Sequence, residues 1–277
     1  MSIVISMIFY TPNKHMQMNN TLTISLLQSN IHWEDKAANL AMFSSKIRAI
    51  QEQTEIIILP EMFNTGFSMN PGSLAENMDG ETVTWMKQMA AEKRSILTGS
   101  LIIRDQEKYY NRLIWMQPNG VYGYYDKRHL FSFAGEDKEF TPGNKRLIAQ
   151  LKGWKINTQI CYDLRFPIWS RQANENEYDI LLFVASWPMK RIEAWKALLT
   201  ARAIENQCYV IGLNRTGMDG NGFEYSGDSM LIDPMGVALF SNHHEEITHT
   251  FQIDKKQVQE VRERLPFLKD KDQFVLV

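Results

Sequence analysis

The sequence has few of the features that mark specialised classes of protein. Only two of its 277 residues are cysteine, which is too few for a disulfide framework and favours a reducing, cytoplasmic location. The 30 Lys and Arg residues nearly balance the 32 Asp and Glu residues, and the net charge of -2 gives no strong attraction to nucleic acid or anionic lipid. We therefore expect the partner to be a small molecule or another copy of the chain.

Long apolar runs and domain linkers are also scarce. The apolar run over residues 1–10 has no basic flank and is far shorter than the roughly 20 residues of a membrane span, so we expect neither a signal peptide nor an anchor. Periodic sequence begins only near Leu22, and residues 1–20 are interpreted as an N-terminal tail outside the fold. From there to Leu265 there is no repeat, low-complexity segment or Pro/Gly/Ser-rich linker. The sequence thus predicts a single domain over residues 21–277.

Hydrophobic periodicity predicts an α/β protein. Apolar side chains alternate over residues 22–28, as in a strand covered on one face, and recur at helical spacing over residues 34–51. Helices are also predicted at residues 82–94 and 192–206. Further strands are predicted at residues 56–59, 95–103, 109–116, 120–125, 146–151, 154–160, 179–185 and 208–213, and a strand running into a turn is predicted at residues 230–236. Some strands alternate with helices and others follow each other directly, which predicts both parallel and antiparallel pairing.

Most familiar catalytic signatures are absent. There is no G-x-S-x-G elbow, no P-loop, no G-x-G-x-x-G and no H-E-x-x-H. Among the six histidines only the adjacent His243 and His244, followed by two glutamates, suggest a metal. Neighbouring residues of a strand point to opposite faces, so we favour a solvated turn there and expect no metal site.

Three segments place an ionisable residue at the end of an apolar strand. Glu61 follows IIILP; a buried carboxylate needs a cation or a raised pKa, and the alternative is a Glu on a surface loop. Lys127 in YYDKRHLF is either a surface cation or the cation that Glu61 needs. Cys161 is followed at once by charged residues, unlike Cys208 in CYVIGL, which fits a buried small hydrophobe. Backbone N–H groups at the strand-to-helix turn are expected to favour the Cys161 thiolate.

Together these segments supply a soft nucleophile, a carboxylate base and a cation, which are the parts needed for acyl transfer through a thioester. LPEMF with Glu61, DKRHLF with Lys127 and CYDLRFP with Cys161 resemble, in that order, the Glu-Lys-Cys triad motifs of the nitrilase, or carbon-nitrogen hydrolase, superfamily. ASWP around Trp187 and ARAIENQ over residues 201–207 match further blocks of that family.

The resemblance implies a fold and a mechanism. The family fold is an αββα four-layer sandwich with two mixed β-sheets, usually paired into a homodimer or larger even assembly, with neither metal nor organic cofactor. Cys161 would attack an amide carbonyl while Glu61 takes the thiol proton and returns it to departing ammonia. Lys127, with the backbone N–H of Tyr162, would hold the oxyanion, and water would then release the acid.

A fourth catalytic residue is implied by the same resemblance. Many family members carry a further glutamate between the lysine and cysteine motifs, before a small-residue–Gly pair. Glu136 in GEDKEFTPG is the best match, seven residues before Gly143, and Glu139 is the alternative. The implied role is to orient the substrate amide or to share the proton transfers.

Within the superfamily, the motifs look most like the omega-amidase branch, which deamidates 2-oxoglutaramate and 2-oxosuccinamate. Such a substrate carries one carboxylate, so its pocket needs a cation and apolar walls. Arg165 is the candidate cation, although pairing with Asp163 or Glu205 is a slightly favoured alternative. The candidate walls are Phe131, Tyr162 and Trp187, which otherwise belong to the core.

Three alternatives remain open on the sequence. The same triad serves other substrates, such as a deaminated-peptide amide, an N-carbamoyl compound or a nitrile. A non-enzymatic reading makes the protein a redox-reactive thiol protein or a binding module. A Cys161–His129 catalytic pair is a further possibility, since His129 lies two residues after Lys127 on a segment expected to be extended.

Overall fold

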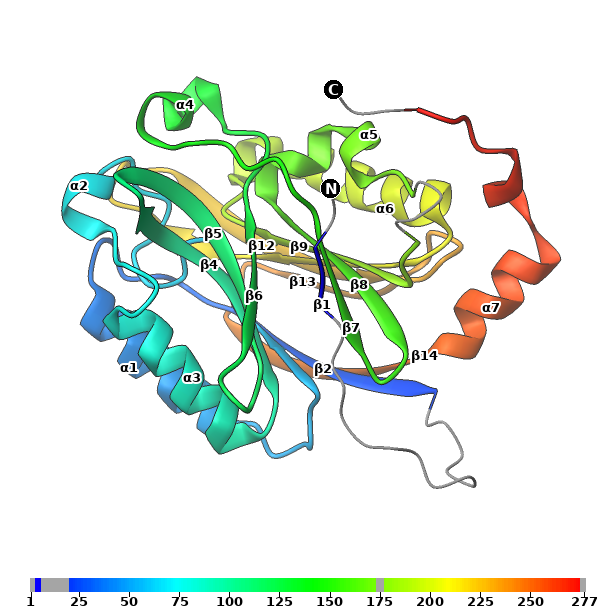
Figure 1. The fold of residues 1–277 in the computed structure, drawn as a ribbon, viewed down its shortest axis with the longest axis horizontal. Coiled ribbons are helices and arrows are strands. Elements are labelled where there is room, and N and C mark those ends of the chain that lie inside the picture. Colours follow the sequence, from blue (N-terminus) through cyan, green and yellow to red (C-terminus); the bar gives the residue numbers. More distant parts are fainter. Residues whose placement is uncertain (1–2, 6–19, 173–176, 275–277) are drawn as a thin grey trace.

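Two mixed β-sheets lie face to face, with helices on their outer sides (Figure 1). The computed structural model describes residues 3–5, 20–172 and 177–274. The eight-stranded sheet contains β1 (Ile3–Ile5), β7 (Leu147–Leu151), β8 (Trp154–Ile160), β9 (Ile180–Ala185), β10 (Tyr209–Asn214), β11 (Thr216–Met218), β12 (Glu224–Ile232) and β13 (Ala238–His243). The six-stranded sheet contains β2 (Thr21–Gln28), β3 (Ile56–Ile58), β4 (Ile96–Asp105), β5 (Lys108–Met116), β6 (Tyr122–Asp126) and β14 (Ile247–Asp254).

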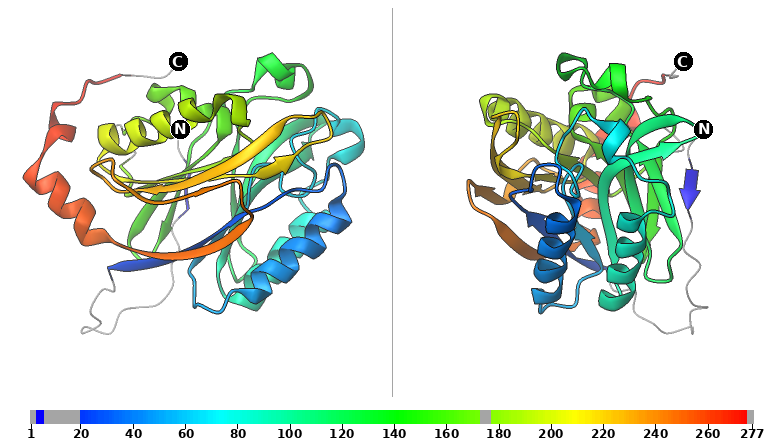
Figure 2. Two further views of the ribbon diagram at one scale, coloured as in Figure 1. Left: turned by 180° about the vertical axis from the view of Figure 1, so that it is seen from behind. Right: turned by 90° about the vertical axis from the view of Figure 1, so that its left-hand side faces the viewer.

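The helices complete a four-layer sandwich. They are α1 (Lys36–Ala49), α2 (Pro71–Leu74), α3 (Glu81–Lys93), α4 (Glu136–Glu139), α5 (Pro167–Ser170), α6 (Ile192–Asn206) and α7 (Lys255–Arg264). Short 3₁₀ turns are η1 (Ser132–Ala134), η2 (Cys161–Arg165), η3 (Met189–Arg191) and η4 (Phe267–Asp270). Helices α1 and α3 cover the six-stranded sheet and α6 covers the other, on opposite sides of the molecule (Figure 2). The predicted αββα sandwich is therefore confirmed.

The strand sequences explain which face each side chain occupies. In β2, Ile24 and Leu26 enter the core between the two sheets, whereas Leu27 packs toward α1 and α3. In β3, Ile56 and Ile58 face the other sheet, and the residue between them faces the helices. A strand covered on both faces needs apolar residues at every position, which accounts for the continuous run at this point of the chain.

Both sheets mix parallel and antiparallel pairs, as the sequence predicts. Strands β2, β3 and β4 are parallel, and β4, β5 and β6 follow as antiparallel neighbours. In the other sheet β8, β9 and β10 are parallel, while β12 pairs with β10 in the antiparallel sense. The parallel strands bring several carboxyl ends to the same edge, which is where open α/β sheets build their sites.

The N-terminal segment falls largely outside the described residues. Within it, residues 3–5 form β1, which pairs in parallel with β7, so these three residues differ from the expected tail outside the fold. Residues 1–2 and 6–19 lie outside the described residues, and the expectation for them remains a prediction. Among the helices that the structure describes, none has both the length and the apolar character needed to cross a membrane.

Candidate active site

Four strands end at one place and bring three predicted residues and Ser186 there. Lys127 directly follows β6, Cys161 directly follows β8, and Ser186 directly follows β9. Glu61 lies just beyond the end of β3, after Leu59 and Pro60. The two sheets therefore both contribute to the site, β3 and β6 from one and β8 and β9 from the other.

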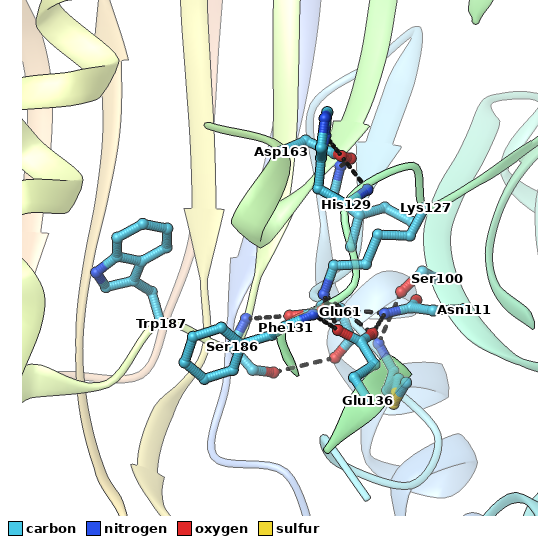
Figure 3. A network of polar contacts seen from close by, with 12 residues as sticks. Glu61, Ser100, Asn111, Lys127, His129, Phe131, Glu136, Asp163, Ser186 and Trp187 are labelled. Atoms are coloured by element: carbon cyan, nitrogen blue, oxygen red, sulfur yellow. Dashed lines mark hydrogen bonds and ion pairs between the residues drawn. The ribbon is translucent and has the colours of Figure 1, made fainter. Parts of the chain in front are cut away.

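Lys127 and two glutamates form a buried ionic cluster. The Lys127 Nζ atom lies 2.9 Å from Glu61 Oε1 and 2.9 Å from Glu136 Oε2, and all three side chains are fully buried. Figure 3 shows the lysine side chain ending between the two carboxylates. Burial alone would lower the pKa of Lys127, but the charges of Glu136 and Glu61 outweigh it and raise that pKa above its ordinary value. Lys127 is therefore a fixed cation rather than a base.

Glu136, rather than Glu139, joins this cluster. Its Oε2 atom accepts a hydrogen bond from the Phe131 backbone N–H at 2.6 Å, and both of its oxygens contact Lys127. Burial raises the pKa of Glu136, and the charge of Glu61 raises it further, against the opposing effect of Lys127. Glu139, by contrast, is exposed. Lys127 supplies one positive charge for two carboxylates, and the raised pKa of Glu136 reflects this shortage of positive charge.

Two partners of Glu61 were not singled out in the sequence. Asn111 Nδ2, from β5, lies 2.8 Å from Glu61 Oε1 and 3.1 Å from Glu136 Oε1, so one amide bridges the two carboxylates. The backbone N–H of Ser186 donates to Glu61 Oε2 at 2.8 Å. The sequence signal for Asn111 was a polar amide next to the apolar half of strand β5. The second is a backbone group, which no residue type reveals.

The nucleophile candidate sits on a strained turn. Cys161 has φ of 45°, in the left-handed region that side chains other than glycine rarely adopt, and it begins η2 immediately after β8. Burial raises the pKa of its thiol well above the ordinary value, and the charge of Glu61 raises it further while Lys127 lowers it. These effects run against the thiolate expected from the turn, because burial and the Glu61 charge outweigh Lys127 and the backbone N–H of Ser186. Glu61 affects this thiol both through its charge and through a side-chain hydrogen bond.

The thiol opens onto a cavity of about 520 Å³, within the size range of small-molecule sites. All the binding residues suggested by the sequence line this cavity together with Cys161. They are Phe131, Tyr162, Arg165 and Trp187, joined by Arg191, which the sequence analysis did not identify. In the view of Figure 3, the rings of Phe131 and Trp187 lie on the same side of the carboxylate cluster.

Arg165 does not make the ion pairs that the alternative interpretation favoured. Asp163 accepts hydrogen bonds from Tyr125 and His129, and Glu205 pairs with Arg202. The Arg165 side chain is exposed, and its guanidinium lies 4.9 Å from the centroid of the Trp187 ring. The interpretation of Arg165 as the partner of Asp163 or Glu205 is thus wrong.

The histidines have other contacts. His129 Nδ1 lies 2.8 Å from Asp163 Oδ1, and the His129 ring stacks on the Phe166 ring with centroids 3.7 Å apart. The hydrogen-bond partner of this ring is therefore Asp163 rather than Cys161. His243 Nδ1 contacts Asp228 at 2.9 Å. Across residues 3–5, 20–172 and 177–274 no group of three or more His, Cys, Asp and Glu side chains is arranged to hold a metal ion.

Known proteins are similar to this chain in sequence and in fold. The family model described as carbon-nitrogen hydrolase matches residues 23–263. The omega-amidase YafV of Escherichia coli K12 is 41% identical over 92% of this chain and 98% of its own. The 2-oxoglutaramate amidase of Bacillus subtilis is 34% identical over 90% of this chain and 96% of its own. The crystal structure of XC1258 from Xanthomonas campestris, a CN-hydrolase superfamily protein, is 42% identical over 93% and 99%, with a TM-score of 0.90.

Proposed function

This chain belongs to the carbon-nitrogen hydrolase family, and from that premise we propose that it is an omega-amidase acting through a cysteine thioester. It hydrolyses the terminal amide of small dicarboxylate omega-amides, such as 2-oxoglutaramate and 2-oxosuccinamate, to the 2-oxo acid and ammonia. Relatives named omega-amidase and 2-oxoglutaramate amidase support this substrate class. The observation that carries the mechanism is the buried Cys161 thiol, which opens onto a cavity and contacts a buried carboxylate held by Lys127.

Acylation begins with proton transfer. Glu61 removes the proton of the Cys161 thiol as the sulfur attacks the amide carbon. A base is needed because burial keeps this thiol protonated. The hydrogen bonds from Asn111 and Ser186 to the two Glu61 oxygens keep the carboxylate aimed during this step.

The tetrahedral intermediate carries a negative charge on the former carbonyl oxygen. We assign its stabilisation to the Lys127 ammonium, with the backbone N–H of Tyr162 as the second donor. When the intermediate collapses, the carbon–nitrogen bond breaks and Glu61 returns its proton to the departing nitrogen, which leaves as ammonia. The acyl group stays on Cys161 as a thioester.

Deacylation repeats the proton transfers with water. Glu61 takes a proton from the water molecule as its oxygen attacks the thioester carbon, and the carbon–sulfur bond then breaks. The sulfur recovers a proton from Glu61, and the free acid departs. Glu136 contacts the Lys127 ammonium with both oxygens, so its assigned role is to hold that ammonium in place. The raised pKa of Glu136 also suits it to exchange a proton during the reaction.

The cavity suits a short acyl chain that ends in a carboxylate. Arg165 supplies a cation, and the rings of Phe131, Tyr162 and Trp187 supply walls. Because guanidinium and carboxylate groups match in geometry as well as charge, Arg165 is the assigned partner of the substrate carboxylate. The names of the relatives favour the keto-amide over the deaminated-peptide amide, N-carbamoyl compound or nitrile.

The test is ammonia release from 2-oxoglutaramate by the purified protein. Wild type is compared with Cys161→Ala and Glu61→Gln, and glutamine, an N-carbamoyl amino acid and a simple nitrile are assayed beside the keto-amide. We expect rapid release from the keto-amide and almost none from either variant. Substantial activity in Cys161→Ala would overturn the mechanism, and preference for the nitrile or the carbamoyl compound would overturn the substrate assignment.

The remaining expectations from the sequence are also proposals. We propose a homodimer or larger even homo-oligomer, as the family resemblance implies, with no nucleic acid or membrane partner. Cytoplasmic location is the proposal that fits two free thiols, Cys161 and Cys208, both of which are buried. Neither a metal nor an organic cofactor enters the proposed reaction.

A further inference from the structure

The cavity contains a second guanidinium that has no assigned role. Arg191, at the end of η3, lines the cavity with its guanidinium 5.2 Å from the centroid of the Phe131 ring. Arg165 lies 4.9 Å from the centroid of the Trp187 ring. The cavity therefore carries two cations, each held against one of its aromatic walls.

Within the part of the chain that the structure describes, neither guanidinium has a carboxylate within 4.0 Å or a side-chain hydrogen bond. Other arginines of the protein do pair, as Arg112 does with Asp126 and Arg202 with Glu205. A guanidinium has five N–H donors and cannot lose its charge at physiological pH. Two such groups beside a reactive thiol are suited to receive an anion.

Trp187 connects the two arginines. Its indole N–H donates to the backbone carbonyl of Arg191 at 2.8 Å, while its ring lies under the guanidinium of Arg165. The Asn214 side-chain amide makes two hydrogen bonds with the Trp187 backbone. Its Oδ1 accepts from the Trp187 N–H at 2.7 Å, and its Nδ2 donates to the Trp187 carbonyl at 3.0 Å. Asn214 is fully buried at the end of β10, so this part of the cavity wall is anchored to the sheet.

The acidic residues of the cavity already have donors. Glu34 accepts a hydrogen bond from the Ser68 hydroxyl at 2.5 Å. Asp219 accepts from the backbone N–H groups of Asn221 and Phe223 and from the hydroxyl of Tyr225. These carboxylates are therefore engaged in holding loops at the cavity, and the arginines are left for the ligand.

We propose that Arg191 and Arg165 together form a carboxylate-binding subsite for the far end of the substrate, and that Arg191 determines specificity for an anionic omega-amide. This inference rests on the proposed function. Two guanidiniums can bind both oxygens of one carboxylate and a neighbouring 2-oxo oxygen, since each offers several donors in a fixed plane. They repel an ammonium group at the same position, so the subsite selects a 2-oxo acid over the corresponding amino acid.

A pair of matched substrates tests this inference. 2-Oxoglutaramate and 4-oxopentanamide have the same reacting amide and the same keto group, but a methyl group replaces the carboxylate in the second. Steady-state kinetics are measured for wild type, Arg191→Gln, Arg165→Gln and Arg191→Lys. Arg48→Gln is the matched control, because Arg48 is an exposed arginine that pairs with Glu92 on the helical surface.

We expect Arg191→Gln to raise KM for 2-oxoglutaramate by about tenfold or more, with little change in kcat, because a charge-assisted hydrogen bond is lost far from the reacting carbon. Kinetics with 4-oxopentanamide should stay within about twofold of wild type. Arg191→Lys should recover only part of the loss, since an ammonium lacks the planar fork. Inhibition by the product 2-oxoglutarate should weaken in parallel with the rise in KM, and Arg48→Gln should match wild type.

Three results would overturn the inference. Unchanged KM for 2-oxoglutaramate in Arg191→Gln would show that Arg191 does not bind the carboxylate. Equal losses on both substrates would show that it only shapes the cavity. Wild type without activity on 2-oxoglutaramate would overturn the proposed function itself, and this outcome is distinguishable because it appears before any substitution.

Discussion

At the scale of single residues, the pKa values in the site depend on how little positive charge is buried beside its acidic groups. Glu61, Glu136 and the Cys161 thiol share Lys127 as the cation within hydrogen-bonding or electrostatic reach. A further negative charge on sulfur is costly in such a place, and burial together with the charge of Glu61 raises the pKa of the Cys161 thiol. This constraint supports the proposed role of Glu61 as the general base.

The pKa of Cys161 should therefore fall when Glu61 loses its charge. Glu61→Gln removes a charge that raises this pKa but leaves Lys127, which lowers it. We expect the thiolate to form at a lower pH in Glu61→Gln than in wild type, although turnover is lost. Thiolate absorbance measured against pH, with Cys161→Ala as the blank, tests this. An upward shift in the variant would contradict the assigned electrostatics.

Asp163 positions the turn that carries Cys161 through hydrogen bonds to residues on two segments. Its Oδ2 atom accepts from the backbone N–H of Ile160 at 3.0 Å and from the Tyr125 hydroxyl at 2.7 Å, and its Oδ1 accepts from the backbone N–H of His129 at 3.0 Å. One carboxylate thus joins the strand end before Cys161 to the segment that carries Lys127. These bonds hold the chain beside Cys161, whose φ of 45° lies in the left-handed region.

We expect Asp163→Asn to lower kcat by about tenfold to a hundredfold with a smaller change in KM, because a misplaced nucleophile is penalised mainly in the chemical step. His129→Ala should retain more activity, since it removes only one of the partners of Asp163. Steady-state kinetics of both variants provide the measurement. Loss of all activity in His129→Ala alone would instead favour a Cys161–His129 pair.

At the scale of the elements, the sequence predicted best where burial is greatest. Helix α6 has the predicted bounds, and β3 was recognised because both of its faces are covered. The helix predicted over residues 34–51 starts later, at Lys36, because the Asp35 side chain caps it by accepting the N–H of Ala38 at 3.0 Å.

Elements with little burial were not located in advance. Strand β13 is mostly exposed, and α7 buries only Val258 and Val261. Such elements carry little hydrophobic periodicity, because their positions depend on partners far away in the sequence. For example, β14 is fixed by antiparallel pairing with β2 at the other end of the chain.

Strand β12 depends on a charged group that gives its stability a distinct pH dependence. Asp228 has φ of 55° and accepts hydrogen bonds from Ser226, Lys196 and His243. Burial alone would raise its pKa, but these three contacts together lower it below the ordinary value of 3.8. A lowered pKa in the folded state means stability that is present above about pH 4 and lost as the pH falls through the lowered pKa.

Asp228→Asn should lower the free energy of unfolding by about 1 kcal/mol near pH 7, since two of the three partners are partly exposed. Asparagine tolerates the left-handed conformation, so the substitution isolates the charge. The difference from wild type should shrink as the pH falls below about 4. Urea denaturation at several pH values tests this, with the exposed Asp270→Asn as control. A difference that does not change with pH would contradict the electrostatic assignment.

At the scale of the whole molecule, the fold brings together residues that the sequence keeps far apart. The motif order predicted that Glu61, Lys127 and Cys161 act together, and the strand ends that carry them meet at one edge of the two sheets. Figure 3 shows Lys127 reaching Glu61 there. Arg191 was not recognised because an arginine before a helix has the appearance of an ordinary surface cation. Its place at the cavity depends on the packing of η3 against β12, a strand more than 30 residues further along the chain.

An exposed apolar area favours the proposed pairing of subunits. Ile204 on α6 lies beside Gly236, and Ile204, Val237 and Leu239 are each more than half exposed. We expect light scattering to give a dimer or a larger even oligomer, and Ile204→Glu to reduce the mass toward that of a monomer. Val121→Glu, at an exposed apolar residue before β6, is the control. A monomeric wild type would contradict the assembly.

The central claim is that Cys161 is acylated by an omega-amide. The most direct measurement is the intact mass of the protein after acid quenching during turnover of 2-oxoglutaramate. We predict a species heavier than the free enzyme by the mass of the substrate minus ammonia, mapped to the peptide that contains Cys161 and absent from Cys161→Ala. Ammonia release without any such species, or the same adduct in Cys161→Ala, would contradict the account.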